Sequence, residues 1–356
     1  MITGDVRRAI ARAVAAEGLP PADPGLRPTG GPGQYASSVA FAFGERRPHG
    51  ATRIAARLTQ TDGIARAELT GPGFITITIA SEELAAQAER IVAAGPACAT
   101  SDALNGVRVP APPPGDPLAA ASWEEARAAL VAQVTARLAA AAGATVALQQ
   151  DMERTVSSPG PEQRAVGGEA TVRYSAGLAE PSASPQPQER EVARAVAFAG
   201  ADAVRFSLAR AVPGRAVAID RQIIARHVLG NPAYAVRYAH ARAASGVRWA
   251  ATSRTAPLRR SAVLRHRPAD PGELVLLDAL SWLPERVATA ARRGRPDEFA
   301  RYLEELASAT IAALIGAGDP GTARVPPTGR LALAKAAQTG LAAGLGLLGV
   351  DAPGRL

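Results

Sequence analysis

Residues 231–242 have the sequence NPAYAVRYAHAR, and this stretch predicts the beginning of a long helix. Asparagine suits a helix N-terminus, and Pro232 is tolerated in the first turn because its missing N–H would have no intrahelical partner there. Tyr234 and Tyr238 are four residues apart, so they share one face of the helix. The stretch therefore predicts a helix that presents an aromatic face.

Arginines surround this helix, and no acidic residue accompanies them. Residues 221–269 contain ten arginines and neither aspartate nor glutamate, in a chain with a net charge of +8. Such a stretch repels itself unless it meets a polyanion, and the planar guanidinium forms paired hydrogen bonds with phosphate. The chain has 39 arginines and one lysine, so a genomic preference explains the choice of arginine but not the missing acids. The stretch favours contact with nucleic acid over a solvated basic face.

The side chains of this region suit two kinds of RNA contact. A tyrosine ring stacks on an unpaired base, and arginine binds the flanking phosphates. Packing of half-buried tyrosines between helices is the alternative interpretation, and both stay open. His240 is expected to be a packed core residue rather than an RNA contact. The candidate RNA-binding residues of this region are Tyr234, Arg237, Tyr238, Arg242, Arg248, Arg221 and Arg226.

The N-terminal part of the chain predicts a small α+β module. Apolar positions spaced by four residues predict a helix over 5–17, and strict alternation predicts a strand over 74–79. The same criteria predict further strands at 35–43 and 67–69 and further helices at 49–59 and 82–94. These elements are enough to bury one hydrophobic core, and we place the module at residues 1–97.

The middle of the chain predicts one strand–helix–strand unit, within residues 104–152, followed by a linker. Strands at 104–109 and 145–148 flank an alanine-rich helix that begins at Trp123. Residues 153–190 are rich in Pro, Ser, Gln and Gly, which is typical of flexible linkers.

From residue 191 to 356 the apolar spacing is helical, and Pro or Gly separates the segments. The predicted helices lie at 192–211, 218–229, 232–252, 272–293, 296–316 and 328–348. We therefore expect a C-terminal helical bundle.

The stretch 231–242 resembles the Asn-Pro-x-Tyr-x-Val-x-Tyr-Ala-His-Ala-Arg signature of arginyl-tRNA synthetases. That signature opens the first long helix of the family's anticodon-binding domain. Upstream, GADAVRF at 200–206 is similar to the family's Gly-Ala-Asp-Ala-[Leu/Val]-Arg-[Tyr/Phe] segment, and GLGLLGV at 344–350 is similar to its C-terminus.

The N-terminal part resembles the same family. YASSVA at 35–40 and GPGFI at 71–75 occur in the order found in the family's N-terminal tRNA-contacting domain. The resemblance covers residues 1–90 and 192–356. By this analogy, Tyr35, Arg53 and Arg57 are the contacts to the tRNA elbow.

The resemblance implies an α+β fold with an N-terminal tRNA-contacting domain at 1–97. Residues 104–152 correspond to a degenerate remnant of a Rossmann-type catalytic domain, and 153–190 to a linker. Residues 191–356 correspond to an all-α DALR anticodon-binding bundle.

Two ATP-binding elements of the family have no counterpart in the sequence. The family's His-x-Gly-His pattern is replaced by PPGDPLAAAS at 113–122, where Ala119 and Ser122 stand near the places of the histidines. A Lys-Met-Ser-Lys loop is excluded because Lys335 is the only lysine of the chain. Such elements supply most of the positioning and charge for adenylate formation. The departure therefore implies no aminoacylation, no catalytic residue and no cofactor.

The chain is thus predicted to be a catalytically inactive relative of arginyl-tRNA synthetases that binds tRNA, chiefly an arginine acceptor. A regulatory role, or delivery of tRNA to an aminoacyl-tRNA-using enzyme or a true synthetase, is expected. The alternatives are residual arginine–tRNA ligase activity, alone or with a separate catalytic partner, and a protein–protein interaction module. The single Cys98 excludes an internal disulfide, and no metal-ligand spacing is present. The sequence predicts a cytoplasmic monomer without a membrane span.

Overall fold

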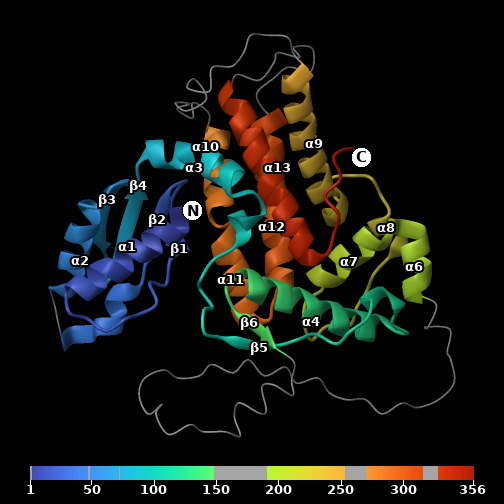
Figure 1. The fold of residues 1–356 in the computed structure, drawn as a ribbon, viewed down its shortest axis with the longest axis horizontal. Coiled ribbons are helices and arrows are strands. Elements are labelled where there is room, and N and C mark those ends of the chain that lie inside the picture. The colour runs from blue at the N-terminus through green and yellow to red at the C-terminus, as the bar shows by residue number, and fades with distance from the viewer. Residues whose placement is uncertain (1, 47–48, 72, 148–190, 253–270, 316–327) are drawn as a thin grey trace, which may run out of the picture. The chain divides into compact units, whose positions relative to one another are not determined.

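The structure is a computed structural model that describes residues 2–46, 49–71, 73–147, 191–252, 271–315 and 328–356 (Figure 1). The predicted linker at 153–190 and the arginines of the basic stretch beyond residue 252 lie outside the described residues. The contacts divide the chain into two compact units. The first comprises Met1–Cys98, Arg242–Leu283 and Ala309–Gly340, and the second comprises Ala99–Ala241, Pro284–Ser308 and Leu341–Leu356.

A four-stranded antiparallel sheet forms the centre of the N-terminal module (Figure 1). Its order is β1-β2-β4-β3, with β1 at Arg27–Pro28, β2 at Gln34–Ser37, β4 at Phe74–Ile79 and β3 at Ile64–Thr70. Along β4 the isoleucines are buried and the threonines are half-buried, as the alternation predicted.

Three helices complete the module: α1 (Ile2–Ala16), α2 (Gly50–Thr59) and α3 (Ser81–Ala94). Helix α2 packs on β3, and α1 packs against α2 and α3.

The strand predicted at 35–43 is wrong beyond residue 37. The chain leaves β2 after Ser37, whose hydroxyl donates to the carbonyl of Pro24 and accepts from the N–H of Val39 at 3.3 Å. These side-chain hydrogen bonds of Ser37 compete with the backbone hydrogen bonds that would continue the strand. Residues Val39–Arg46 consequently form the 3-10 helix η1.

Tyr35 is fully buried, and it anchors β2 to helix α10 (Pro271–Ser281). Its hydroxyl donates to Asp278 Oδ1 at 3.0 Å and lies 3.2 Å from Ser281 Oγ. Its ring meets that of Trp282 edge-on, with centroids 5.2 Å apart. Burial, together with the Asp278 carboxylate, raises the pKa of Tyr35, so the hydroxyl stays a donor. The predicted contact of Tyr35 with tRNA is therefore wrong, because no part of the side chain is accessible.

The second unit contains the predicted strand–helix–strand. Strands β5 (Arg108–Pro110) and β6 (Thr145–Ala147) pair in parallel, and α4 (Trp123–Ala141) connects them. The short 3-10 helices η2 (Gly95–Ala99) and η3 (Pro117–Ala119) lie along the same part of the chain. The parallel pair joined by a helix agrees with the predicted α+β class.

The predicted helix at 192–211 is divided into α6 (Glu191–Ala199) and α7 (Ala201–Arg210). Gly200 separates them at a φ of 87°, which a residue with a side chain adopts only with strain. The helix predicted at 218–229 is reduced to α8 (Arg221–Ile224).

Four more helices complete the α-helical part: α9 (Pro232–Thr252), α11 (Leu283–Arg293), α12 (Pro296–Ile315) and α13 (Thr328–Leu348). Helix α11 is distinct from α10, although one helix was predicted there, because Pro284 has no N–H to continue the ladder. The segment Leu331–Leu348 of α13 is long and apolar enough to cross a membrane, but half of it is buried within the fold.

Replacing Tyr35 with Phe should lower the free energy of unfolding by about 1.5–3 kcal/mol, the usual contribution of a hydrogen bond to a charged group. The ring stays in place, so only the hydrogen bonds of the hydroxyl to Asp278 and Ser281 are lost. Urea unfolding followed by circular dichroism measures the change. Tyr234→Phe, at a half-buried position, is the control and should leave stability unchanged. Equal stability of Tyr35→Phe and the wild type would show that Tyr35 does not anchor β2.

Candidate nucleic-acid interface

Buried Asn231 fixes the beginning of α9 and the loop before it. Its side-chain amide donates to the carbonyls of Ile224 at 2.7 Å and Arg226 at 2.8 Å. Its own carbonyl accepts the first helical bond, from the N–H of Ala235 at 2.8 Å. The helix start that the sequence predicted is confirmed, and the loop carrying Arg226 is attached to it.

Aromatic rings form a stacked row where α9 begins. The rings of Tyr234 and Tyr238 are 5.7 Å apart with an angle of 22° between their planes, as residues one turn apart allow. His227, in the preceding loop, stacks on Tyr234 at 5.3 Å and 12°. Both tyrosines are half-buried. The two half-buried rings pack on one another, as one of the two interpretations predicted, and the contact with an RNA base stays a prediction.

Three of the candidate arginines are exposed. Arg221 is the first residue of α8, and Arg226 lies in the loop between α8 and α9. Arg242 lies on the third turn of α9. The guanidinium carbon of Arg221 is 5.9 Å from the ring centroid of Phe198, which is itself 59% exposed. In this position the guanidinium group of Arg221 can still donate hydrogen bonds to phosphate, while its aliphatic part covers apolar surface.

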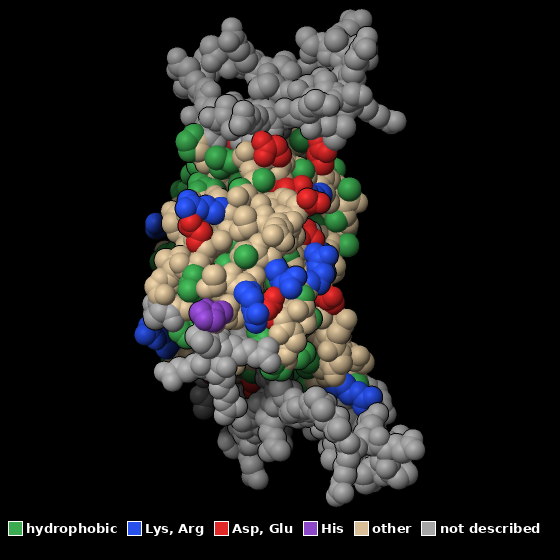
Figure 2. Space-filling view, turned by 90° about the vertical axis from the view of Figure 1, so that its left-hand side faces the viewer, with side chains coloured by type: hydrophobic (Ala, Val, Ile, Leu, Met, Phe, Trp, Pro, Cys, Tyr) green, Lys and Arg blue, Asp and Glu red, His purple; other side chains and the backbone are tan. Residues whose placement is uncertain are grey.

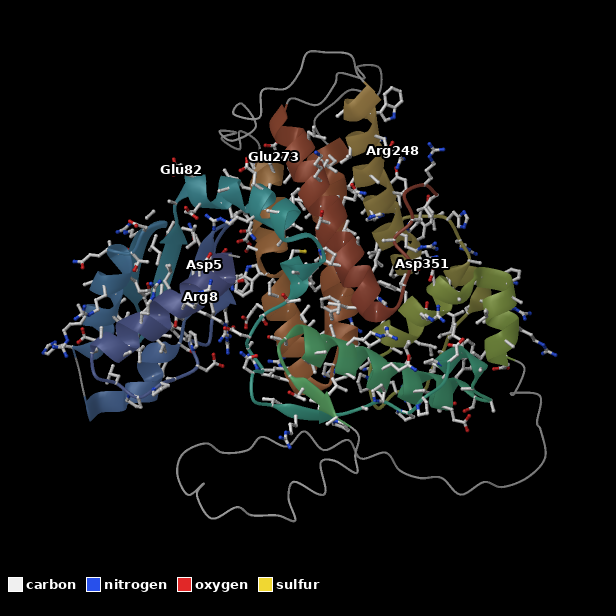
Figure 3. All side chains as sticks on the ribbon, in the orientation of Figure 1. Asp5, Arg8, Glu82, Arg248, Glu273 and Asp351 are labelled. Carbon is white, nitrogen blue, oxygen red and sulfur yellow. The ribbon has the colours of Figure 1, made fainter. Side chains whose placement is uncertain are left out.

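Arg237 and Arg248 are placed differently. Arg237 pairs with Asp202 at 3.2 Å, and both side chains are largely buried. Asp202 also accepts from the backbone N–H of Asp351 at 3.2 Å, so it joins α9 to the C-terminal segment. Arg248 extends from α9 and is half-buried (Figure 3). Although residues 221–269 contain no acidic residue, Arg237 is thus paired with an aspartate from another helix.

His240 is a core residue, as predicted. It is 3% exposed, and its Nδ1 donates to the carbonyl of Pro353 at 2.9 Å. Burial lowers the pKa of His240 against the opposing effect of that carbonyl, so the imidazole is neutral at physiological pH.

The arginines of the N-terminal module are paired with acids. Residues 1–97 contain ten arginines and nine acidic residues, and Figure 2 shows blue and red side chains interspersed on this side of the molecule. Arg53 and Arg57 are both exposed, but each binds Glu17, at 2.8 Å and 2.6 Å. This module therefore presents no excess charge of the kind found at residues 221–252.

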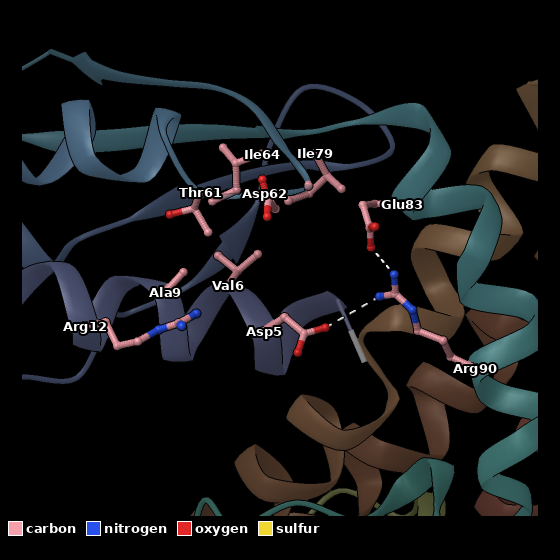
Figure 4. Close-up of a pocket in the computed structure, with 11 residues that line it drawn as sticks. Asp5, Val6, Ala9, Arg12, Thr61, Asp62, Ile64, Ile79, Glu83 and Arg90 are labelled. Atoms are coloured by element: carbon pink, nitrogen blue, oxygen red, sulfur yellow. Dashed lines mark hydrogen bonds and ion pairs between the residues drawn. The ribbon is translucent and has the colours of Figure 1, made fainter.

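A pocket of about 490 Å³ lies between α1, α3 and the loop that leads into β3 (Figure 4). Arg90 crosses its side and binds Asp5 at 3.6 Å as well as Glu83. The lining contains three acidic residues and two arginines, so this pocket has no excess of positive charge for a polyanion. In the parts of the chain that the structure describes, no group of three or more His, Cys, Asp or Glu side chains is arranged to hold a metal.

The N-terminal module contains an exposed aromatic pair that is not among the residues suggested by the sequence. Phe41 is 50% exposed and Phe74 is 36% exposed, and their rings meet edge-on with centroids 4.9 Å apart. The signal was available, because Phe74 alternates with the buried isoleucines of β4 and must point to the other face. Phe41 could not be placed, because it lies on the unpredicted helix η1.

The segment that stands in place of the family's His-x-Gly-His element caps two helices. Asp116 accepts from the N–H of Leu118 at 3.1 Å at the start of η3. Ser122 accepts from the N–H of Glu125 at 3.2 Å and begins α4. Both side chains satisfy backbone donors at helix N-termini, which is a structural role.

Comparisons with known proteins agree with this architecture. The family model of the DALR anticodon binding domain matches residues 236–356. The arginine–tRNA ligase of Frankia alni is 38% identical over 128 residues, which cover 33% of this chain and 22% of that protein. The arginine–tRNA ligase of Bifidobacterium longum subsp. infantis is 39% identical over 79 residues, which cover 21% of this chain and 13% of that protein. The chain thus matches less than a quarter of the length of these relatives.

The fold is similar to that of a solved structure, Thermus thermophilus arginyl-tRNA synthetase. The TM-score is 0.66 at 16% identity, and the alignment covers 100% of both chains. The helical C-terminal part, the signature at the start of α9 and these relatives lead to one conclusion. Residues 236–356 match the DALR anticodon-binding domain, and the chain is similar to arginine–tRNA ligases over part of its length.

Proposed function

We propose that this protein binds tRNA through the loop before α9 and the exposed side of that helix. The observation that carries the proposal is the exposure of Arg221, Arg226 and Arg242 in a stretch without any acidic residue. Unpaired, exposed guanidinium groups gain most from phosphate, because binding releases the counterions condensed on the nucleic acid. The half-buried rings of Tyr234 and Tyr238 add aromatic surface for unpaired bases.

An arginine acceptor is the tRNA that we propose, because the curated relatives are arginine–tRNA ligases. A second contact belongs to the N-terminal module. There the exposed Phe41–Phe74 pair replaces Tyr35 as the aromatic candidate, and Arg53 and Arg57 contribute only if RNA competes with Glu17. Sequencing the RNA that co-purifies with the protein tests the choice of tRNA. Enrichment of other acceptors would contradict it.

The proposed role is regulation, or delivery of tRNA to an aminoacyl-tRNA-using enzyme or a true synthetase, by a catalytically inactive monomer in the cytoplasm. Two features support inactivity. The chain has one lysine, and the side chains at 113–122 cap helices instead of offering imidazoles to ATP. The alternative of ligase activity, alone or with a catalytic partner, is kept because the family relatives carry that name. The alternative of a protein-binding module is favoured by exposed apolar side chains near α8, such as Ile223.

Changing Arg221, Arg226 and Arg242 together to Gln should weaken binding to every tRNA. The slope of log affinity against log salt should flatten by up to about 0.9 for each lost phosphate contact. Filter binding at several salt concentrations measures both quantities. Arg237 is left intact in this variant, because its pair with Asp202 supports the fold.

The matched control changes Arg7, Arg8 and Arg66 to Gln, which removes the same charge from the N-terminal module. Each of these arginines is paired with an acid: Asp23, Asp5 and Glu68, respectively. The control should keep the affinity and slope of the wild type within a small factor. Equal effects of the two variants would mean that only net charge matters, and an unaffected first variant would remove α9 from the binding surface.

Arginine-dependent exchange of pyrophosphate into ATP should stay at background, with or without tRNA, because the chain lacks the groups that hold the transferring phosphates. An active arginyl-tRNA synthetase assayed with the same tRNA and ATP serves as the positive control. Exchange clearly above background would favour the ligase alternative, while leaving the tRNA-binding proposal intact.

A further inference from the structure

His227 is the outermost ring of the row that begins at Tyr238. It lies in the loop between α8 and α9 and is exposed, whereas Tyr234 beneath it is half-buried. The planes of His227 and Tyr234 are only 12° from parallel. An exposed imidazole held flat on a tyrosine offers its outer side to one more planar group.

The loop that carries His227 is fixed at both ends. On one side, Asp220 caps α8 by accepting from the N–H of Gln222 at 2.8 Å. On the other side, the buried amide of Asn231 holds the carbonyls of Ile224 and Arg226, and its backbone N–H donates to Val228 at 2.9 Å. The ring is thus placed before any ligand arrives, so little conformational entropy is lost on binding.

The surroundings of the ring fit a nucleotide. Val228 and Leu229, which follow it in the chain, are 52% and 55% exposed, and Arg226, which precedes it, is exposed as well. Aromatic and apolar surface matches the face and edges of a base, and an arginine beside it matches the phosphate. A platform of this kind binds an unstacked base and excludes a base that is paired inside a helix.

We propose that His227 receives one unpaired base of the bound RNA on its outer face, with Arg226 at the adjoining phosphate. The inference rests on the proposed tRNA binding and adds the position of one nucleotide to it. His227 was not among the residues suggested by the sequence, because only its stacking on Tyr234 shows that it belongs to the row.

The test uses tRNA transcripts in which 2-aminopurine replaces one anticodon-loop base at a time, together with the full-length protein. The unaltered protein should quench the fluorescence of one position, because stacking quenches this base. His227→Ala should abolish that quenching and weaken binding about 5- to 100-fold, with the salt slope unchanged. His227→Phe should restore both, since it keeps a flat ring.

His49→Ala is the control, because His49 is also exposed but lies at the start of α2. It should behave as the unaltered protein, and thermal unfolding checks that every variant folds. If His227→Ala keeps full affinity and quenching, or if His227→Phe is as weak as His227→Ala, the stacking proposal is overturned while tRNA binding stands. If the unaltered protein binds no tRNA, the proposed function and this inference both fail.

Discussion

The half-buried carboxylate of Asp278 is the constraint on which the first unit depends. It accepts from the hydroxyl of Tyr35 and from the backbone N–H of Gly33, both at 3.0 Å, across more than 240 residues of sequence. A carboxylate that is partly removed from water is stabilised when hydrogen-bond donors replace the lost water. Strand β2 and helix α10 are therefore held together by these bonds, and Tyr35, which the family analogy suggested as an RNA contact, belongs to the core.

Charge in the second unit is arranged by ion pairs between different helices. Asp202 on α7 neutralises Arg237 on α9, and Glu304 on α12 binds Arg210 at 2.6 Å. These partly buried pairs hold the helices of the unit, and they leave the arginines of the loop before α9 to face solvent. Among the described arginines of the stretch, Arg221, Arg226 and Arg242 have exposed side chains that can meet phosphate.

RNA recognition and adenylate formation require different arrangements of side chains. Recognition of a single-stranded loop needs exposed rings and cations on a rigid support, which α9 and its preceding loop provide. Adenylate formation needs charge concentrated on a triphosphate, yet residues 113–122 carry alanine, proline and helix caps. The proposed function follows from the exposed arginines and stacked rings near the start of α9.

The sequence by itself determined the elements whose signals are local. The start of α9, the alternation of β4 and the succession of β5, α4 and β6 follow from capping, from a period of two and from an alanine-rich helix between short strands. Only the tertiary structure decided which candidate side chains face solvent. Tyr35 is hydrogen-bonded to Asp278, Arg237 forms an ion pair with Asp202, and His227 stacks on Tyr234. Each of these contacts involves a partner residue on another element. Hydrophobic periodicity reports only on neighbours along the same element, so it could not predict such a partner.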